Sequence, residues 1–261
     1  TAVPVQDENG IPYSPRKQGA GLVQLQNAVK TDVFLLNSDN TKPKAEIGYN
    51  ESGNFSFDFK AVSIGDDTVQ YEPTITVLTE DTVSENGVVY MAQKARKLSN
   101  NEVSVTIPKK ITVTPSGETP VNVKIELTEK GKTNLKSQFP NRIYLEGFVT
   151  LTPIQNDEVS LSYPFMGFFG DWQALNIFDS DIYDDEPASI CETQIGQFRN
   201  SDGGGYILGH NYYVDGATEY NANKIAIKGS ETGKNVTAAV SLLRNADKLT
   251  FSVDDSEGNT V

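Results

Sequence analysis

The sequence contains a single cysteine, Cys191, and a single histidine, His210, among its 261 residues. One cysteine cannot form an internal disulfide, so a disulfide-stapled fold and every zinc site built on several cysteines are excluded. One histidine restricts catalysis almost as strongly, because a Ser-His-Asp triad needs a histidine to take the proton of its nucleophile. No Gly-x-Ser-x-Gly motif accompanies His210, and we expect this residue to be an ordinary loop or strand-edge histidine.

Basic residues and long apolar runs are also scarce. The chain has 22 Lys and Arg against 35 Asp and Glu, which gives a net charge of −13. Because a surface of this charge repels phosphate backbones, we expect no nucleic-acid partner. No stretch approaches the roughly 18 consecutive apolar residues of a membrane-spanning helix, so we expect no transmembrane segment in this chain. The chain opens on Thr1 without a secretory leader, and we expect it to be a processed or truncated piece.

A period-two alternation of apolar and polar residues fills the region from residue 31 to about residue 165. Alternation places one face of a strand in a core and the other in water, and several such runs between turns indicate two packed antiparallel sheets. A second alternating region runs from residue 225 to 253. With a length that suits two domains, these patterns predict an all-β chain. The clearest runs are Phe55–Phe59, Val103–Ile107, Val121–Leu127, Leu145–Leu151, Val159–Tyr163 and Leu249–Val253.

Helical periodicity is limited to two short segments. Residues 21–30 place apolar side chains such as Leu25 and Val29 at helical spacing. This predicts an amphipathic helix whose apolar face needs a partner that the preceding residues cannot supply. Residues 129–139 are a second candidate, weakened by Gly131.

The acidic run of residues 179–186 offers oxygen atoms at spacings that a calcium ion uses. Asp179, Asp181 and Asp184 are the candidate ligands. The run lacks the central glycine and terminal glutamate of a helix-loop-helix calcium loop. We therefore favour a solvated acidic loop and keep a calcium site as the alternative; we expect no other cofactor.

Two further features of the irregular region between residues 174 and 220 have ordinary explanations. The glycines of residues 203–205 lack the Lys-Ser/Thr that follows in a phosphate-binding loop, so we expect a tight turn. The acidic neighbour Glu192 does not favour the thiolate form that a reactive cysteine needs. We therefore expect Cys191 to be a buried or half-buried structural thiol.

Three segments carry longer motifs. Residues 13–23 read Tyr-Ser-Pro-Arg-Lys-Gln-Gly-Ala-Gly-Leu-Val, and residues 163–172 read Tyr-Pro-Phe-Met-Gly-Phe-Phe-Gly-Asp-Trp. The third is Leu-Leu-Arg-Asn at residues 242–245, with the strand and turn of residues 249–259. In this order the segments resemble the C-terminal accessory region of subtilisin-like serine proteases of the Gram-positive cell envelope.

The resemblance implies a domain organisation. Residues 1–30 would be the end of a subtilisin-like catalytic domain, and residues 31–165 a first fibronectin type III-like β-sandwich. Residues 166–261 would be a second such domain, which we expect to be truncated. The family's catalytic Asp, His and Ser motifs would precede Thr1, so no catalytic residue is assigned and this chain alone is not expected to be an enzyme. The helix of residues 21–30 would then be poorly packed or make substitute contacts in this chain, because its partner is the missing catalytic domain.

The resemblance also implies a function and a location. The chain would be a non-catalytic accessory region of an extracellular, wall-associated endopeptidase, with the catalytic domain and protein substrates as partners. Loops within residues 174–220 would lie near the active-site cleft and form a substrate exosite. Aromatic residues make good binding hot spots, so Trp172, Tyr206, Tyr212 and Tyr213 are the candidates.

Two other functions stay open at this point. Tandem β-sandwiches also serve as surface adhesins or stalks without protease activity, and fold alone does not choose between these roles. A carbohydrate-binding module would need an exposed row of aromatic side chains, for which Tyr206, Tyr212 and Tyr213 are a weak hint. A serine-protease motif encoded shortly before Thr1 would decide for the protease.

Overall fold

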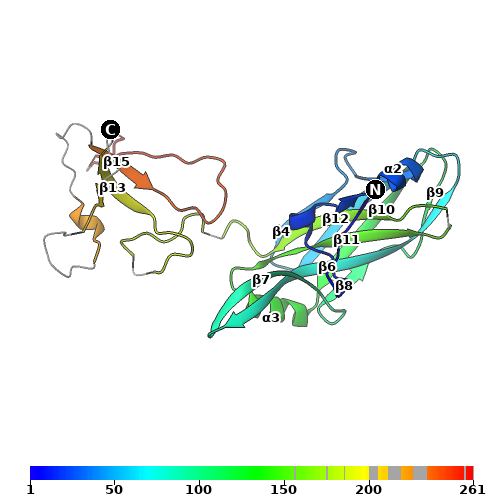
Figure 1. Ribbon diagram of the computed structural model, residues 1–261, viewed down its shortest axis with the longest axis horizontal. Helices are drawn as coiled ribbons and strands as arrows, with labels where there is room; N and C mark the ends of the chain where they lie inside the picture. Colours follow the sequence, from blue (N-terminus) through cyan, green and yellow to red (C-terminus); the bar gives the residue numbers. More distant parts are fainter. Residues whose placement is uncertain are drawn as a thin grey trace. The chain divides into compact units, whose positions relative to one another are not determined.

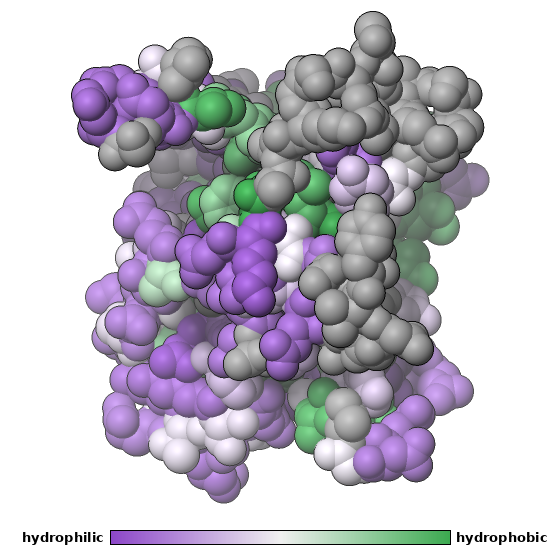
Figure 2. Space-filling model, turned by 90° about the vertical axis from the view of Figure 1, so that its left-hand side faces the viewer, coloured by the Kyte–Doolittle hydropathy of each residue, from purple (hydrophilic) through white to green (hydrophobic). Residues whose placement is uncertain are grey.

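The computed structural model describes residues 1–155, 157–174, 176–184, 186–199, 205–210, 219–225, 234–255 and 257–260. The chain divides into two compact units, Thr1–Trp172 and Gln173–Val261. Within the described residues, no helix is long and apolar enough to cross a membrane. Figure 2 shows a face on which hydrophilic residues cover much of the described surface and hydrophobic residues form separate patches.

The first unit is a β-sandwich, as the alternation predicts (Figure 1). The smaller sheet has the order β3-β5-β10-β8, and the larger has the order β4-β12-β11-β6-β7 with β9 added to β6. All pairs are antiparallel except β12 with β4, which are parallel. The strands are β3 (Val33–Asn37), β4 (Ala45–Asn50), β5 (Asn54–Ser63), β6 (Val69–Glu85), β7 (Val88–Lys97), β8 (Val103–Thr106), β9 (Ile111–Val113), β10 (Glu118–Leu127), β11 (Ile143–Pro153) and β12 (Leu161–Phe169).

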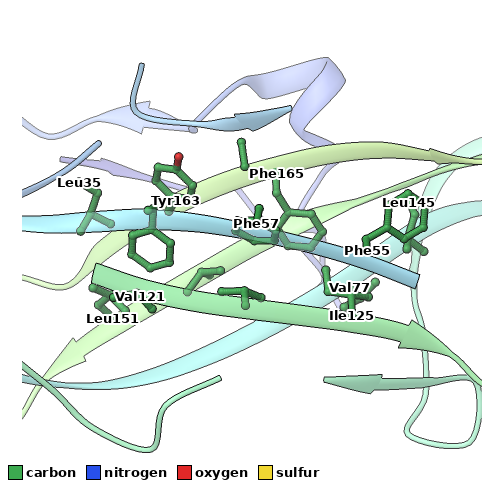
Figure 3. Close-up of a cluster of buried hydrophobic side chains, with 14 of the residues drawn as sticks. Leu35, Phe55, Phe57, Val77, Val121, Ile125, Leu145, Leu151, Tyr163 and Phe165 are labelled. Carbon is green, nitrogen blue, oxygen red and sulfur yellow. The ribbon is translucent and has the colours of Figure 1, made fainter. Parts of the chain in front are cut away.

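The core lies between the two sheets and is rich in aromatic rings (Figure 3). Every second residue of β5 is buried, so Phe55, Phe57 and Phe59 point toward the larger sheet. Tyr163 of β12 stacks on Phe59 with 4.6 Å between ring centroids, and Phe165 lies 5.3 Å from Phe57. Burial of this apolar surface is the main stabilising contribution to the sandwich.

The predicted helix near residue 130 is confirmed as α3 (Glu129–Gln138). The Thr128 hydroxyl accepts a hydrogen bond from the backbone N–H of Gly131 at 3.1 Å, which caps the helix. Leu135 is buried against the sandwich. Gly131 does not weaken the helix: a side chain at this position would collide with the carbonyl of Glu102. Close packing, rather than flexibility, therefore requires glycine here.

An ion pair joins β7 to the turn that precedes β8. Nη1 of Arg96 donates to both carboxylate oxygens of Glu102, at 3.1 and 3.0 Å. The backbone N–H and the hydroxyl of Ser99 donate to the same carboxylate at 3.1 and 2.9 Å. Burial by itself would raise the pKa of Glu102, but these hydrogen bonds outweigh it and lower the pKa to about 2 from the ordinary 4.5.

We expect Glu102 to make the first unit sensitive to acid. A carboxyl group whose folded-state pKa is lowered stabilises the protein above its unfolded pKa, and this contribution disappears as the pH falls through the folded pKa. The contribution, on the order of 2 kcal/mol, should therefore be lost between about pH 4.5 and pH 2. Urea unfolding at several pH values should show a flatter acid limb for Glu102→Gln than for the wild type. Identical pH dependence of the two proteins would contradict this assignment.

The N-terminal residues differ from the predicted helix of residues 21–30. Residues Leu22–Val23 form strand β2, which pairs with β1 (Ala2–Val3), and the helix α2 begins only at Leu25 and ends at Lys30. A second, unpredicted helix, α1, spans Pro15–Gln18. The reason is that Gly21 takes a φ of +107° and its backbone lies against Val3, which leaves no room for a helical turn.

The first unit also extends past the predicted boundary at residue 165. Strand β12 continues to Phe169 in register with β11, and Phe165 and Phe169 are both buried in the core. The apolar run of residues 166–172 therefore completes the first sandwich instead of opening the next domain, and the compact unit reaches Trp172.

The second unit contains a three-stranded sheet in its described part, with the order β14-β13-β15. Its elements are β13 (Gln194–Arg199), β14 (Gly205–Ile207), β15 (Lys234–Ala239) and the 3-10 helix η1 (Ala222–Lys224). The predicted strand 249–253 is not formed, and Phe251 and Val253 are exposed. Alternation makes a strand only where a partner strand covers one face, and residues 249–253 have none in the described chain. Most of the predicted strand at residues 225–227 lies outside the described residues.

Candidate functional site

Only two of the four predicted exosite aromatics, Trp172 and Tyr206, lie among the described residues, and they belong to different units. Trp172 is half-buried at the end of the first unit, where its ring lies 4.9 Å from Phe168 and 5.7 Å from Tyr144. Tyr206 belongs to the second unit, is exposed, and donates through its hydroxyl to the side-chain oxygen of Gln197 at 3.3 Å. Tyr212 and Tyr213 lie outside the described residues, so the exosite stays a prediction.

Asp179, the first calcium candidate, organises a loop through backbone amides. Its carboxylate accepts hydrogen bonds from the N–H groups of Ser189 at 2.9 Å, Ile190 at 2.7 Å and Cys191 at 3.3 Å. The Ser189 hydrogen bond and its neighbours lower the pKa of Asp179, although burial acts in the opposite direction. Both carboxylate oxygens are therefore engaged in holding the loop.

The other two calcium candidates make no cluster with Asp179. An oxygen of Asp181 accepts from the backbone N–H of Tyr183 at 2.9 Å, and Asp184 is exposed. Among the residues that the structure describes, no three acidic, histidine or cysteine side chains are grouped to hold a metal ion. The described geometry favours the loop-organising role of these acids.

The structure also shows the contacts of the single histidine and the exposure of the single cysteine. Nδ1 of His210 lies 3.2 Å from the carbonyl oxygen of Glu219, and its ring packs at 4.7 Å on Tyr220. The expectation of a buried or half-buried Cys191 was wrong, because its thiol is exposed. The loop turns its amides inward toward Asp179, which leaves the Cys191 side chain at the surface.

Within the first unit, Arg16 forms ion pairs with two buried glutamates. Nε and Nη2 of Arg16 donate to the two oxygens of Glu146 at 3.1 and 2.9 Å, and Nη2 also donates to Glu80 at 2.8 Å. The side chain of Arg16 is 27% exposed, whereas those of Glu80 and Glu146 are only 3% and 1% exposed. We call these three residues the arginine clamp. It joins α1 to strands β6 and β11 of the larger sheet.

An aromatic group surrounds the arginine clamp on the outer face of the larger sheet. The guanidinium carbon of Arg16 lies 4.2 Å from the ring centroid of Tyr144, a cation–π geometry. Tyr144 in turn contacts Phe168 and Trp172. Partial burial acts to lower the pKa of Arg16, but the two carboxylates outweigh it and raise the pKa, so the guanidinium stays charged.

Local sequence explains why Arg16 points at the sheet. Ser14 caps α1 by accepting from the N–H of Arg16 at 3.1 Å, and Pro15 occupies the first helical turn. The side-chain amide of Gln18 bridges the carbonyls of Val5 and Tyr13 at 3.2 and 2.6 Å. These hydrogen bonds tie Val5, Tyr13 and Gln18 together, and Arg16 attaches this segment to the sandwich.

The same N-terminal segment exposes several large apolar side chains. We call their surface the N-terminal apolar face; its residues are Val3, Val5, Tyr13, Leu22, Val23, Leu25 and Val29. On α2 the side chains of Leu25 and Val29 are 77% and 89% exposed, and the helix buries none of its residues. The prediction that this helix would be poorly packed is confirmed. An apolar face on an anchored segment is typical of a surface that another domain covers.

We expect the exposed residues of α2 to contribute nothing to the stability of this chain. Replacing Leu25 and Val29 together by glutamine removes no buried contact, so the free energy of unfolding should change by less than about 0.5 kcal/mol. Leu135→Ala in the buried face of α3 is the positive control and should cost about 2–5 kcal/mol. Urea unfolding of the three proteins gives the comparison. A large loss in the double variant would mean that α2 packs against the sandwich in solution.

Comparison with known proteins identifies the kind of chain that carries these features. A family model described as an Fn3-like domain matches residues 46–166. A C5a peptidase of Streptococcus pyogenes serotype M18 is 29% identical over 189 residues, which is 72% of this chain and 15% of that protein. A PII-type proteinase of Lacticaseibacillus paracasei is 27% identical over 280 residues, 100% of this chain and 14% of that protein. The PIII-type proteinase of Lactococcus lactis subsp. cremoris is likewise 27% identical, with 13% of its length covered.

These relatives confirm the resemblance seen in the sequence. The chain is homologous to a segment of large bacterial peptidases and spans about one seventh of their length. Among solved structures, the PapD-like domain 7 of human CEP192 is similar at 15% identity, covering 59% of this chain and 96% of that one. Its TM-score of 0.35 is too low to support an argument.

Proposed function

We propose that this chain, homologous to a segment of C5a peptidases and PII- and PIII-type proteinases, is the non-catalytic accessory region of an extracellular, wall-associated subtilisin-like serine endopeptidase. In this proposal residues 1–30 close the catalytic domain. Residues 31–165, extended by the end of β12, form the first fibronectin type III-like sandwich. The residues after Trp172 contribute the second, and the accessory region supports the catalytic domain.

One observation carries the proposal: the N-terminal apolar face is exposed on a segment that the arginine clamp fixes to the sandwich. The segment contacts the sandwich through Arg16, and it leaves Leu25 and Val29 exposed. A segment held in this way would fix the sandwich relative to the domain that covers the apolar face, which in this proposal is the catalytic domain. In the homologous proteinases, most of the length lies outside the matched part.

The experiment replaces apolar residues of α2 by charges in the full-length parent protein. Leu25→Glu with Val29→Glu should lower the thermal unfolding temperature of the parent, because two carboxylates would be forced into an apolar interface. The matched control is Val105→Glu, another exposed apolar position, on β8. An unfolding temperature equal to that of the control would defeat the supporting role.

The exosite is tested separately from the supporting role. In the parent, exchange of the loops within residues 174–220 should change cleavage of protein substrates but leave cleavage of a short peptide unchanged. Unaltered cleavage of every protein substrate would defeat the exosite. A parent without a serine-protease motif ahead of Thr1 would decide for the alternative, a surface adhesin or stalk.

A further inference from the structure

We propose that one end of the first sandwich binds a basic peptide segment of another protein, in which apolar side chains adjoin lysine or arginine. Three segments form this end: the residues just before β3, the β5–β6 turn and the β11–β12 turn. The backbone N–H of Ile64 donates to the carbonyl of Asp32 at 2.8 Å, and the side-chain amide of Gln155 donates to the carbonyl of Thr68 at 3.3 Å. These hydrogen bonds join the three segments into one surface within the first unit. We call it the acidic end; its carboxylates are those of Asp32, Asp66, Asp67, Asp157 and Glu158.

The negative charge of the acidic end is not balanced by basic residues. None of its five carboxylates forms an ion pair with another residue of the described chain. Lys30 is the only basic residue within residues 30–32, 64–68 and 154–160, so these segments carry a net charge of −4. Lys60 on β5 is already paired with Glu118 at 3.2 Å. Lys110 precedes the Ile111–Tyr71 pair of β9 and β6 and therefore lies further along the sheet.

The carboxylates of the acidic end are close enough to repel one another. Burial is the largest cause that raises the pKa of Glu158, and the charges of Asp32, Asp67 and Asp157 raise it further. A hydrogen bond from the backbone N–H of Val159 acts in the opposite direction but does not outweigh them. A cationic side chain placed among these carboxylates would relieve the repulsion, which favours a basic ligand.

Two buried polar atoms at the acidic end lack hydrogen-bond partners. Tyr71 is fully buried, and neither its hydroxyl nor Oε2 of Glu158 has a partner. Burial and then the charges of Glu158 and Asp32 raise the pKa of Tyr71, so its hydroxyl lies toward these carboxylates. An unpaired buried oxygen is costly. Lysine and arginine side chains carry the N–H donors that Glu158 lacks, and a rotation of this half-buried side chain would bring Oε2 to the ligand.

Exposed apolar side chains lie among the acids. Ile64 is 69% exposed in the β5–β6 turn, and Ile154 is 45% exposed in the β11–β12 turn. Apolar side chains of a bound segment would cover these isoleucines while its basic side chains meet the surrounding carboxylates. An acidic segment of equal hydrophobicity lacks the second contact. A metal ion is not the expected ligand, since among the described residues no three acidic side chains are grouped to hold one.

The test measures fluorescence anisotropy of a fluorescein-labelled hexapeptide, Gly-Lys-Leu-Arg-Ile-Lys, with the full chain at low salt. Binding should saturate, and Asp67→Asn with Asp157→Asn should weaken it by about 3- to 10-fold, the loss of two exposed charge contacts. The matched control is Glu51→Gln with Glu126→Gln. It removes two exposed carboxylates near the start of β5, at the opposite end of the sandwich, and should have little effect. A peptide with serine in place of leucine and isoleucine should bind more weakly.

Three results would overturn the proposal. These are the absence of saturable binding to the wild type, an equal loss of affinity in the two double variants, and equal affinity of the serine peptide. The second result would mean general attraction to a chain of net charge −13 rather than binding at the acidic end. The acidic end belongs to the first unit alone, and binding there needs no protease activity. Its failure would therefore leave the accessory role standing, and the reverse also holds.

Discussion

Arg16→Ala should be the most destabilising single change on the surface of the first unit, with a loss of about 3–5 kcal/mol in the free energy of unfolding. The substitution leaves two carboxylates that are 3% and 1% exposed, Glu80 and Glu146, without their shared cation. Removing one partner of a buried ion pair leaves an uncompensated buried charge and is strongly destabilising. Replacing both partners by apolar residues is often nearly neutral. Because Arg16 is itself about a quarter exposed, water can reach part of the vacated space, and the lower end of the range is expected.

The single tryptophan makes this prediction easy to measure. Trp172 contacts Tyr144, the ring on which Arg16 stacks, so its fluorescence reports on the surroundings of the arginine clamp during urea unfolding of the full chain. Arg16→Lys keeps the charge but cannot make the bidentate contact with Glu146, and it should fall between alanine and the wild type.

A rescue variant separates buried charge from lost packing. Combining Arg16→Ala with Glu80→Gln and Glu146→Gln removes both buried charges and should recover a substantial part of the stability. If Arg16→Ala costs less than about 1 kcal/mol, or if the triple variant is no more stable than Arg16→Ala, the arginine clamp is not what fixes the N-terminal segment.

Gly147→Ala should disrupt the larger sheet at its centre. Gly147 lies in β11 opposite Val77 of β6 and Phe165 of β12, and its φ of +154° is one that side chains rarely adopt. A Cβ atom here would collide with the carbonyl oxygen of Thr76 on the neighbouring strand. Since backbone in the middle of a paired sheet cannot move aside cheaply, we expect a loss greater than about 3 kcal/mol or failure to fold.

Gly87→Ala is the matched control for backbone strain without a collision. Gly87 has a φ of +81° in the turn between β6 and β7, and a Cβ there would meet no atom within 4 Å. Its cost should be about 1–2 kcal/mol, the penalty of the left-handed conformation alone. Thermal unfolding followed by circular dichroism compares the two variants. Equal losses would show that strain, not the collision, governs position 147.

The strands of the first sandwich could be predicted because their pattern is local. Alternation in Phe55–Phe59 and Val121–Leu127 fixes which side chains face the core before any partner strand is known. The same reasoning failed at residues 249–253, where the alternation is present but no described strand covers one face. It also misplaced the boundary at residue 165, because the register of β12 with β11 is set by pairing across the sheet.

The arginine clamp was not predicted. Arg16 is separated by 64 residues from Glu80 and by 130 residues from Glu146 along the chain. The available signal was a glutamate inside an apolar strand, Glu146 between Leu145 and Gly147, which needs a partner when it is buried. The sequence motif around Arg16 indicated homology but not which side chains it meets.

The sequence by itself determined the all-β class, the aromatic core of the first sandwich, the absence of a cysteine framework and the homology to a protease segment. Each of these depends on composition, on period-two spacing or on contiguous motifs. Only the tertiary structure decided that Arg16 bridges two strands and that β12 continues to Phe169 in register with β11. These features join residues far apart in the chain, and such contacts follow from strand order and sheet packing, which no local pattern encodes.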